Sequence, residues 1–171
     1  MKRLGLLIAL WAPMMLAQAA PKPADAPPDP LALVAWMAGG TWHGEVAAPG
    51  GGAATRIDMQ LKRTLAGHAI SFNTSFNGTL QYEGHFGYDA VRKQIVFAYG
   101  GADGGWVEGN VQPQPEFLLW DFNVHESDGS SGHYQVHVHQ DGADDFTWAL
   151  FRPSGDGWVP MFQIKYHRVA G

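Results

Sequence analysis

Gly40-Thr41-Trp42-His43-Gly44 and Tyr166-His167-Arg168 are the two stretches that decide the fold of this 171-residue chain. The first opens the earliest segment with strand-like alternation, and the second ends the last such segment. In a closed meander barrel the final strand returns to pair with the first. An arginine there can stack on a tryptophan while donating hydrogen bonds to carbonyl groups. Gly40, Trp42 and Arg168 are therefore predicted to form the seam of a barrel.

Short segments of alternating apolar and polar residues, separated by turn residues, fill the chain between these stretches. The clearest pair, residues 68–76 and 79–88, flanks Asn77-Gly78, which favours the type I′ turn of a two-residue hairpin. No segment after Gly40 is long and periodic enough for a second helix. The sequence predicts an all-β fold, an antiparallel up-and-down (meander) barrel of about 8–10 strands with a short N-terminal helix at one end.

The short helix is predicted over residues 31–38, after an N-cap at Asp29. Leu33, Trp36 and Met37 fall on one side of it at helical spacing. That apolar side is expected to cover one end of the barrel. The alternative is a helix packed on the outside of the barrel.

Residues 1–19 have the pattern of a signal peptide, in which Lys2 and Arg3 precede the apolar residues 4–16 and the small-residue cleavage site at 17–19. A membrane anchor is the alternative, but 13 apolar residues are too few to span a bilayer. Residues 20–30 are predicted to form a Pro-rich linker and residues 31–171 the barrel domain. The expected location is periplasmic or secreted, with no membrane span after cleavage.

The charge of the chain disfavours nucleic acid and anionic lipid as partners. Loss of Lys2 and Arg3 with the leader takes the net charge from −5 to −7, and both kinds of partner require clustered positive charge to neutralise phosphate groups. The absence of cysteine excludes disulfides and thiolate metal sites. A protein of this kind must depend on its apolar core for stability.

Several short motifs give the chain a family resemblance. Gly40-x-Trp42 and Arg168, with Leu65-Ala66-Gly67 and the run of residues 82–89, resemble the calycin superfamily, the lipocalin-like barrels. More closely, the chain is similar to uncharacterised bacterial exported lipocalin-like proteins, over residues 40–168. The resemblance implies a barrel fold and no particular activity. Gly84 and Gly87 are expected where bulky neighbours or a bend leave no room for a side chain.

Haem is the cofactor for which the calycin resemblance offers a precedent. The haem-binding nitrobindin-like calycins hold iron through a histidine in a His-Leu-x-x-x-Leu context near the C-terminus. The corresponding stretch here is Lys165-Tyr166-His167-Arg168. His167 alternates with Tyr166 and is expected to point away from the apolar row. No cofactor is therefore predicted, and a haem-binding barrel is kept as an alternative.

A row of histidines is the best candidate for a metal site. His133, His137 and His139 fall on one side of a predicted strand, and His125 lies on the strand before it. Zinc requires three or four protein ligands, and no acidic residue stands in the row at ligand spacing. The row is predicted to be a solvated polar face without a metal, His137 and His139 being its weak candidates. No catalytic residue is predicted, because the chain lacks the G-x-S-x-G elbow and a phosphate-binding loop.

The sequence predicts an exported, non-enzymatic protein that holds a small apolar or amphipathic molecule in an aromatic-lined barrel. A structural or protein-interaction module with a filled lumen is the alternative, followed by a small barrel enzyme. The oligomeric state is left open. Eight residues on the apolar strand faces are candidates for ligand contact: His68, Phe72, Tyr82, Phe86, Trp120, Tyr134, Trp148 and Phe162.

Overall fold

The computed structural model describes residues 28–47 and 52–169 of the chain. The predicted signal peptide and most of the predicted linker lie outside the described residues. No helix in the described ranges combines the length and the apolar character needed to cross a membrane.

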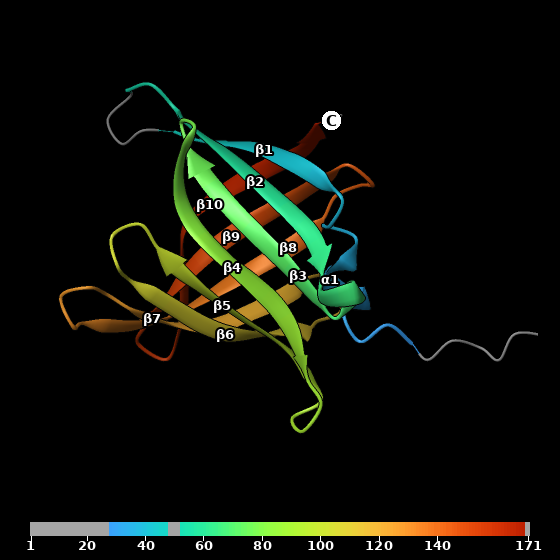
Figure 1. The fold of residues 1–171 in the computed structure, drawn as a ribbon. Coiled ribbons are helices and arrows are strands. Elements are labelled where there is room, and N and C mark those ends of the chain that lie inside the picture. Colours follow the sequence, from blue (N-terminus) through green and yellow to red (C-terminus); the bar gives the residue numbers. More distant parts are fainter. Residues whose placement is uncertain (1–27, 48–51, 170–171) are drawn as a thin grey trace, which may run out of the picture.

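Ten antiparallel strands form one closed barrel, in which each strand pairs with its sequence neighbours and the last pairs with the first (Figure 1). The strands are β1 (Gly40–Val46), β2 (Thr55–Thr64), β3 (Ala69–Phe76), β4 (Thr79–Asp89), β5 (Gln94–Gly101), β6 (Trp106–Pro113), β7 (Leu118–His125), β8 (Ser131–Gln140), β9 (Asp145–Ser154) and β10 (Gly157–Val169). A one-turn 3-10 helix, η1 (Leu65–Gly67), connects β2 to β3. The predicted all-β meander barrel is confirmed.

The seam between β1 and β10 joins the stretch around Trp42 to the stretch around Arg168. Trp42 pairs with Arg168 in register, and the Arg168 guanidinium carbon lies 4.2 Å from the centre of the Trp42 ring. Arg168 Nη2 donates a hydrogen bond of 2.7 Å to the Trp36 carbonyl, and Arg168 Nε lies 3.1 Å from a carboxylate oxygen of Asp144. A Cβ on Gly40 would lie 2.6 Å from Arg168 Nη1. One guanidinium thus connects the first strand, the last strand and the helical segment.

The N-terminal helix is shorter than predicted, and it buries a different side. α1 (Ala32–Ala35) has one turn, and Asp29 Oδ1 accepts a 2.9 Å hydrogen bond from the Leu31 amide. The assignment of Leu33 to the covered side was wrong, because a helix this short does not carry the 3.6-residue repeat as far as Met37. Leu33 is 40% exposed, whereas Leu31, Val34 and Met37 are fully buried.

The buried residues of α1 and its flanks belong to the barrel core, so the helix covers one end of the barrel (Figure 1). Trp42 Nε1 donates a 2.8 Å hydrogen bond to the Met37 carbonyl. The Phe146 ring lies 4.8 Å from the Trp42 ring and 5.5 Å from the Trp36 ring, centre to centre. Ile70, like Trp42 and Phe146, is fully buried. This end of the lumen is therefore filled.

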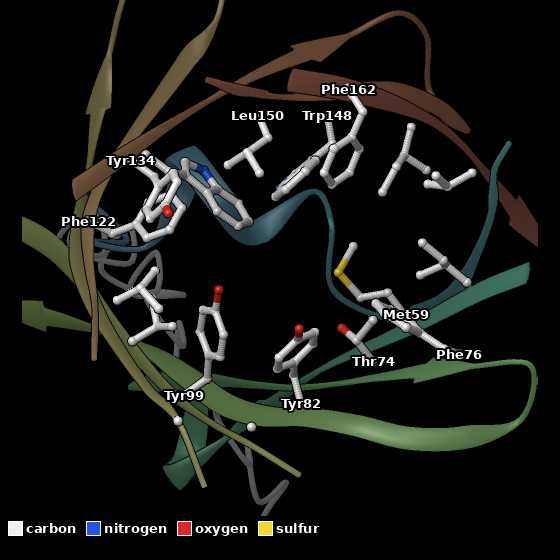
Figure 2. A pocket seen from close by; sticks show the side chains of 18 of the residues that line it. Met59, Thr74, Phe76, Tyr82, Tyr99, Phe122, Tyr134, Trp148, Leu150 and Phe162 are labelled. Carbon is white, nitrogen blue, oxygen red and sulfur yellow. The ribbon is translucent and has the colours of Figure 1, made fainter. Parts of the chain in front are cut away.

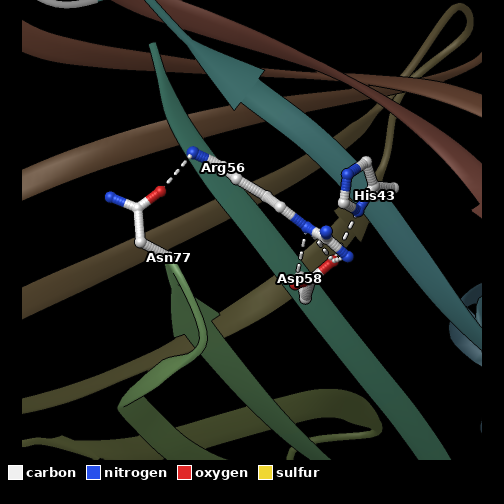
Figure 3. A network of polar contacts seen from close by, with 4 residues as sticks. All are labelled: His43, Arg56, Asp58 and Asn77. Carbon is white, nitrogen blue, oxygen red and sulfur yellow. Dashed lines mark hydrogen bonds and ion pairs between the residues drawn. The ribbon is translucent and has the colours of Figure 1, made fainter. Parts of the chain in front are cut away.

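The hairpin of β3 and β4 turns at Asn77-Gly78, where both residues have positive φ (49° and 82°) as a type I′ turn requires. Figure 3 shows the Asn77 side chain accepting a 3.0 Å hydrogen bond from the Arg56 amide of β2. A β-bulge opposite Thr74 and Ser75 leaves Gln81 unpaired. The strict alternation predicted for β4 therefore fails before Tyr82, and Leu80 is exposed.

Two glycines of β4 have opposite surroundings. A Cβ on Gly84 would lie 2.2 Å from the Ala98 carbonyl oxygen and 2.3 Å from Tyr99 Cβ, whereas a Cβ on Gly87 would meet nothing within 4 Å. The expectation of close packing holds for Gly84 and is wrong for Gly87.

Arg168→Ala is expected to lower the free energy of unfolding by about 1–3 kcal/mol, because it removes a charged hydrogen-bond donor and its stacking on Trp42. Urea unfolding measures this change. Arg92→Ala is the control, since it removes only an exposed ion pair with Asp89, of 3.5 Å. Equal midpoints for the two variants would show that the seam contacts do not stabilise the barrel.

Gly84→Ala is expected to destabilise the protein by about 1–3 kcal/mol, because the new methyl group meets the backbone of β5, which must shift. Gly87→Ala is the matched control on the same strand. It is expected to melt within a degree or two of the parent, because its free energy of unfolding should change by roughly 0.5 kcal/mol at most. Thermal unfolding followed by circular dichroism compares them. A neutral Gly84→Ala would contradict the close approach of β4 and β5.

Candidate functional site

The half of the barrel remote from α1 encloses a cavity of about 510 Å³. In Figure 2 the view runs into this cavity, with the helical segment lying behind it. The lining comes from the strand ends opposite α1 and from the middle of the barrel. Trp106, Met161 and Phe162 line the cavity and are also exposed (46%, 47% and 42%), so this end opens to solvent.

Aromatic rings make up two facing walls of the cavity. Tyr82 and Tyr99 lie on one wall with their ring centres 5.5 Å apart. Trp148 and Phe162 lie on the facing wall, 5.9 Å apart (Figure 2). The first pair is edge-to-face and the second is tilted, both of which are favourable packing geometries for aromatic rings. The rings of each wall therefore hold one another in place beside an unfilled space.

Six lining residues carry hydroxyl groups: Thr55, Thr74, Tyr82, Tyr99, Tyr134 and Tyr166. The hydroxyls of Thr74, Tyr82 and Tyr99 point toward the middle of the cavity (Figure 2), and within the described ranges none of them makes a hydrogen bond. Burial, and then the negative charges of Asp103 and Glu126, raise the pKa of Tyr82. Burial, and then Tyr82, raise the pKa of Tyr99. Both phenols are neutral near pH 7 and can donate or accept a hydrogen bond.

Two carboxylates stand at the open end. Asp103 lies in the turn between β5 and β6, where its Oδ1 accepts a 3.0 Å hydrogen bond from the Gly105 amide. Glu126 follows β7 directly. Both side chains line the cavity and are exposed. Among the described residues the lining contains no lysine, arginine or histidine, so the charge that they give the cavity mouth is negative.

Trp120 contributes its ring to the cavity wall, but its indole nitrogen does not face the cavity. Its Nε1 is the one buried side-chain nitrogen or oxygen without a hydrogen-bond partner among the described residues. The ring packs against Phe86 at 5.2 Å and Phe97 at 5.4 Å. Because Nε1 is sealed from solvent within the wall, it offers no anchor to a molecule in the cavity.

Six of the eight predicted ligand-contact residues line the cavity: Phe72, Tyr82, Trp120, Tyr134, Trp148 and Phe162. Phe86 does not line it. Its side chain is 1% exposed and packs in the filled half, where its ring contacts Phe72 and Trp120. Alternation fixes the face of a strand residue but not its height along the barrel axis. His68 is exposed and also lies outside the cavity. It caps η1 with helical φ and ψ, so the alternation that placed it beside Ile70 begins only at Ala69.

Other residues also line the cavity, among them Tyr99, Asp103 and Glu126. Tyr99 could have been found, because Ile95, Phe97 and Tyr99 alternate along β5 in the same way as the residues that were chosen. Asp103 and Glu126 could not, since they lie in turns, where alternation assigns no face.

The predicted histidine row lies on the outer surface of the barrel. His133 Nε2 is 2.7 Å from Asp121 Oδ1. His137 is stacked between Phe117 and Phe151, with ring centres 4.0 and 4.2 Å away. Burial, and then the neighbouring His139, lower the pKa of His137. Nowhere in the described ranges do three His, Cys, Asp or Glu side chains lie close enough together to hold a metal ion.

Other histidines also pair with carboxylates on the outside. His43 Nδ1 lies 2.5 Å from Asp58 Oδ1, and Arg56 binds the same carboxylate at 3.0 Å (Figure 3). Burial acts to raise the pKa of Asp58, but the hydrogen bonds from Arg56 and His43 outweigh it and lower the pKa. His167 points outward, as predicted, and pairs with Asp145. These contacts stabilise the outer surface and do not enter the cavity.

The sequence matches no model of a known protein family, and a search of curated proteins finds no match to it.

Alkaline pH is expected to destabilise the fold through the enclosed tyrosines. The pKa values of Tyr82, Tyr99 and Tyr166 are raised in the folded state. The stability that they contribute is therefore complete below the unfolded pKa of about 10 and is lost as the pH rises above it. Urea unfolding between pH about 9 and 11.5 measures this loss, which Tyr99→Phe should reduce. Tyr88→Phe, at an exposed tyrosine, is the control; an equal reduction in both variants would contradict the assignment.

Proposed function

We propose that this protein is an exported carrier of the calycin type that holds a small apolar or amphipathic molecule in the cavity at the open end of its barrel. A volume of about 510 Å³ lies within the range of small-molecule sites, which are mostly apolar with a few placed polar groups. The observation that carries the proposal is the set of three hydroxyls, Thr74, Tyr82 and Tyr99, directed into an aromatic hollow.

The contrast between the two halves of the barrel supports binding over a purely structural role. Near α1 the lumen is filled by fully buried side chains such as Trp42, Phe86 and Phe146. At the other end similarly large rings leave a hollow. An unfilled hollow forfeits dispersion contacts and lowers stability. A scaffold would gain from filling both halves, whereas a carrier requires one half to stay open.

The composition of the lining favours binding over catalysis. Among the described residues it contains no serine, histidine or lysine, which are frequent nucleophiles and bases in catalysis, and its carboxylates, Asp103 and Glu126, are exposed at the mouth. The calycin assignment draws support from the closed meander, the helix at one end and the Trp42–Arg168 seam. Export draws support from the signal-peptide pattern of residues 1–19.

Binding can be tested with N-phenylnaphthylamine, an uncharged probe whose fluorescence rises in apolar surroundings. The probe is expected to quench tryptophan fluorescence, and at about 100 times its Kd to raise the melting temperature by roughly 5–10 °C. Leu150→Trp adds a large ring to the cavity lining and is expected to weaken binding at least about ten-fold with little loss of stability.

Leu80→Trp is the matched control for this experiment, because Leu80 is exposed and does not line the cavity. It is expected to bind the probe like the parent. Equal probe affinity for both variants would place the binding elsewhere and refute the proposed cavity function.

A further inference from the structure

The cavity has charge of one sign only. Asp103 and Glu126 are the charged residues of its lining, and in the described part of the chain neither forms an ion pair with a lysine, arginine or histidine. The carboxylates therefore remain uncompensated beside a largely apolar space.

Both carboxylates stand on the same side of the cavity mouth. Trp106 of β6 pairs with His125 of β7, which brings the turn before β6 next to the turn after β7. A Cβ on Gly104 would lie 3.6 Å from Ser127 Cβ. Asp103 and Glu126, one in each turn, therefore bring their negative charges to the same side of the cavity mouth. Their charges reach the Tyr82 hydroxyl inside the cavity and raise its pKa.

Aromatic faces accompany these charges. Trp106, at the mouth, and the neighbouring Tyr82 and Tyr99 present rings to the same space. An organic cation gains from a nearby aromatic face and from nearby carboxylates, whereas a carboxylate ligand meets repulsion from both. Partial enclosure in the barrel strengthens both effects relative to open water.

We propose that the cavity selects an amphipathic organic cation, whose apolar body lies between the aromatic walls and whose ammonium group lies near Asp103, Glu126 and Tyr82. This inference rests on the proposed carrier function and names the class of its ligand. It excludes fatty acids and other carboxylates of similar size as the preferred cargo.

Three ligands with the same chain and different head groups test the inference: octyltrimethylammonium, octanol and octanoate. Each is titrated against the protein loaded with N-phenylnaphthylamine, at low ionic strength and below its micellar concentration. The expected order of affinity is cation, then alcohol, then carboxylate, with at least about ten-fold between the first and last. Raising the salt to about 0.5 M should shrink this preference, because salt screens exposed charges.

Asp103→Asn and Glu126→Gln keep the size and hydrogen-bonding capacity of each side chain and remove its charge. Each is expected to weaken octyltrimethylammonium binding about three- to ten-fold and to leave octanol unchanged. Asp156→Asn is the matched control, an exposed acid in the β9–β10 turn at the same end of the barrel and outside the lining.

The outcomes separate this inference from the function on which it rests. Binding of octanol with equal affinity for cation and carboxylate would refute the charge selection and leave the carrier in place. An effect of Asp156→Asn as large as that of the two lining variants would refute the roles of Asp103 and Glu126. Failure of both N-phenylnaphthylamine and octanol to bind would refute the carrier itself.

Discussion

The stacking of Arg168 on Trp42 is the interaction on which the rest of the structure depends. A ten-strand meander has two edges until its last strand pairs with its first. Arg168 stands at that junction and also donates to the Trp36 carbonyl, while Trp42 donates to the Met37 carbonyl. The same pair of side chains therefore closes the sheet and holds the helical segment across one end. The residues that close the barrel also hold its end closed, which explains why a one-turn helix is firmly anchored.

Closure of one end gives the barrel an unequal interior. Large rings fill the lumen beside α1, and the aromatic walls beyond them leave about 510 Å³ open to solvent. A filled half with more buried contacts can compensate for a hollow half whose walls forgo contacts across the cavity. The hollow half also carries the features that a packed core avoids: free hydroxyls at Thr74, Tyr82 and Tyr99, and carboxylates at the rim. The half beside α1 thus contributes most to stability, and the opposite half carries the features of the proposed binding role.

The fold was largely predictable from the sequence, because residue alternation and a two-residue turn such as Asn77-Gly78 are local signals. The faces of most strands followed in the same way, and six of the eight candidate contacts line the cavity. Alternation says which face a residue occupies, but not at what height along the axis, so Phe86 was predicted to contact a ligand although it packs in the filled half. Alternation also assigns no face beyond the end of a strand. The strand was predicted to begin at His68, which lies in a turn, so His68 was wrongly given a face. Asp103 lies in another turn and was given none. The size of the cavity depends on how ten strands curve together and could not be predicted locally.

The division into a filled and a hollow half is tested most directly by following the tryptophan indole N–H signals in two-dimensional NMR while N-phenylnaphthylamine is added. Trp106 and Trp148 line the cavity, whereas Trp36 and Trp42 lie at the closed end. The account predicts that the signals of the first pair shift with probe concentration and saturate together, while those of the second pair stay in place. Shifts of Trp36 and Trp42 without shifts of Trp106 and Trp148 would contradict it.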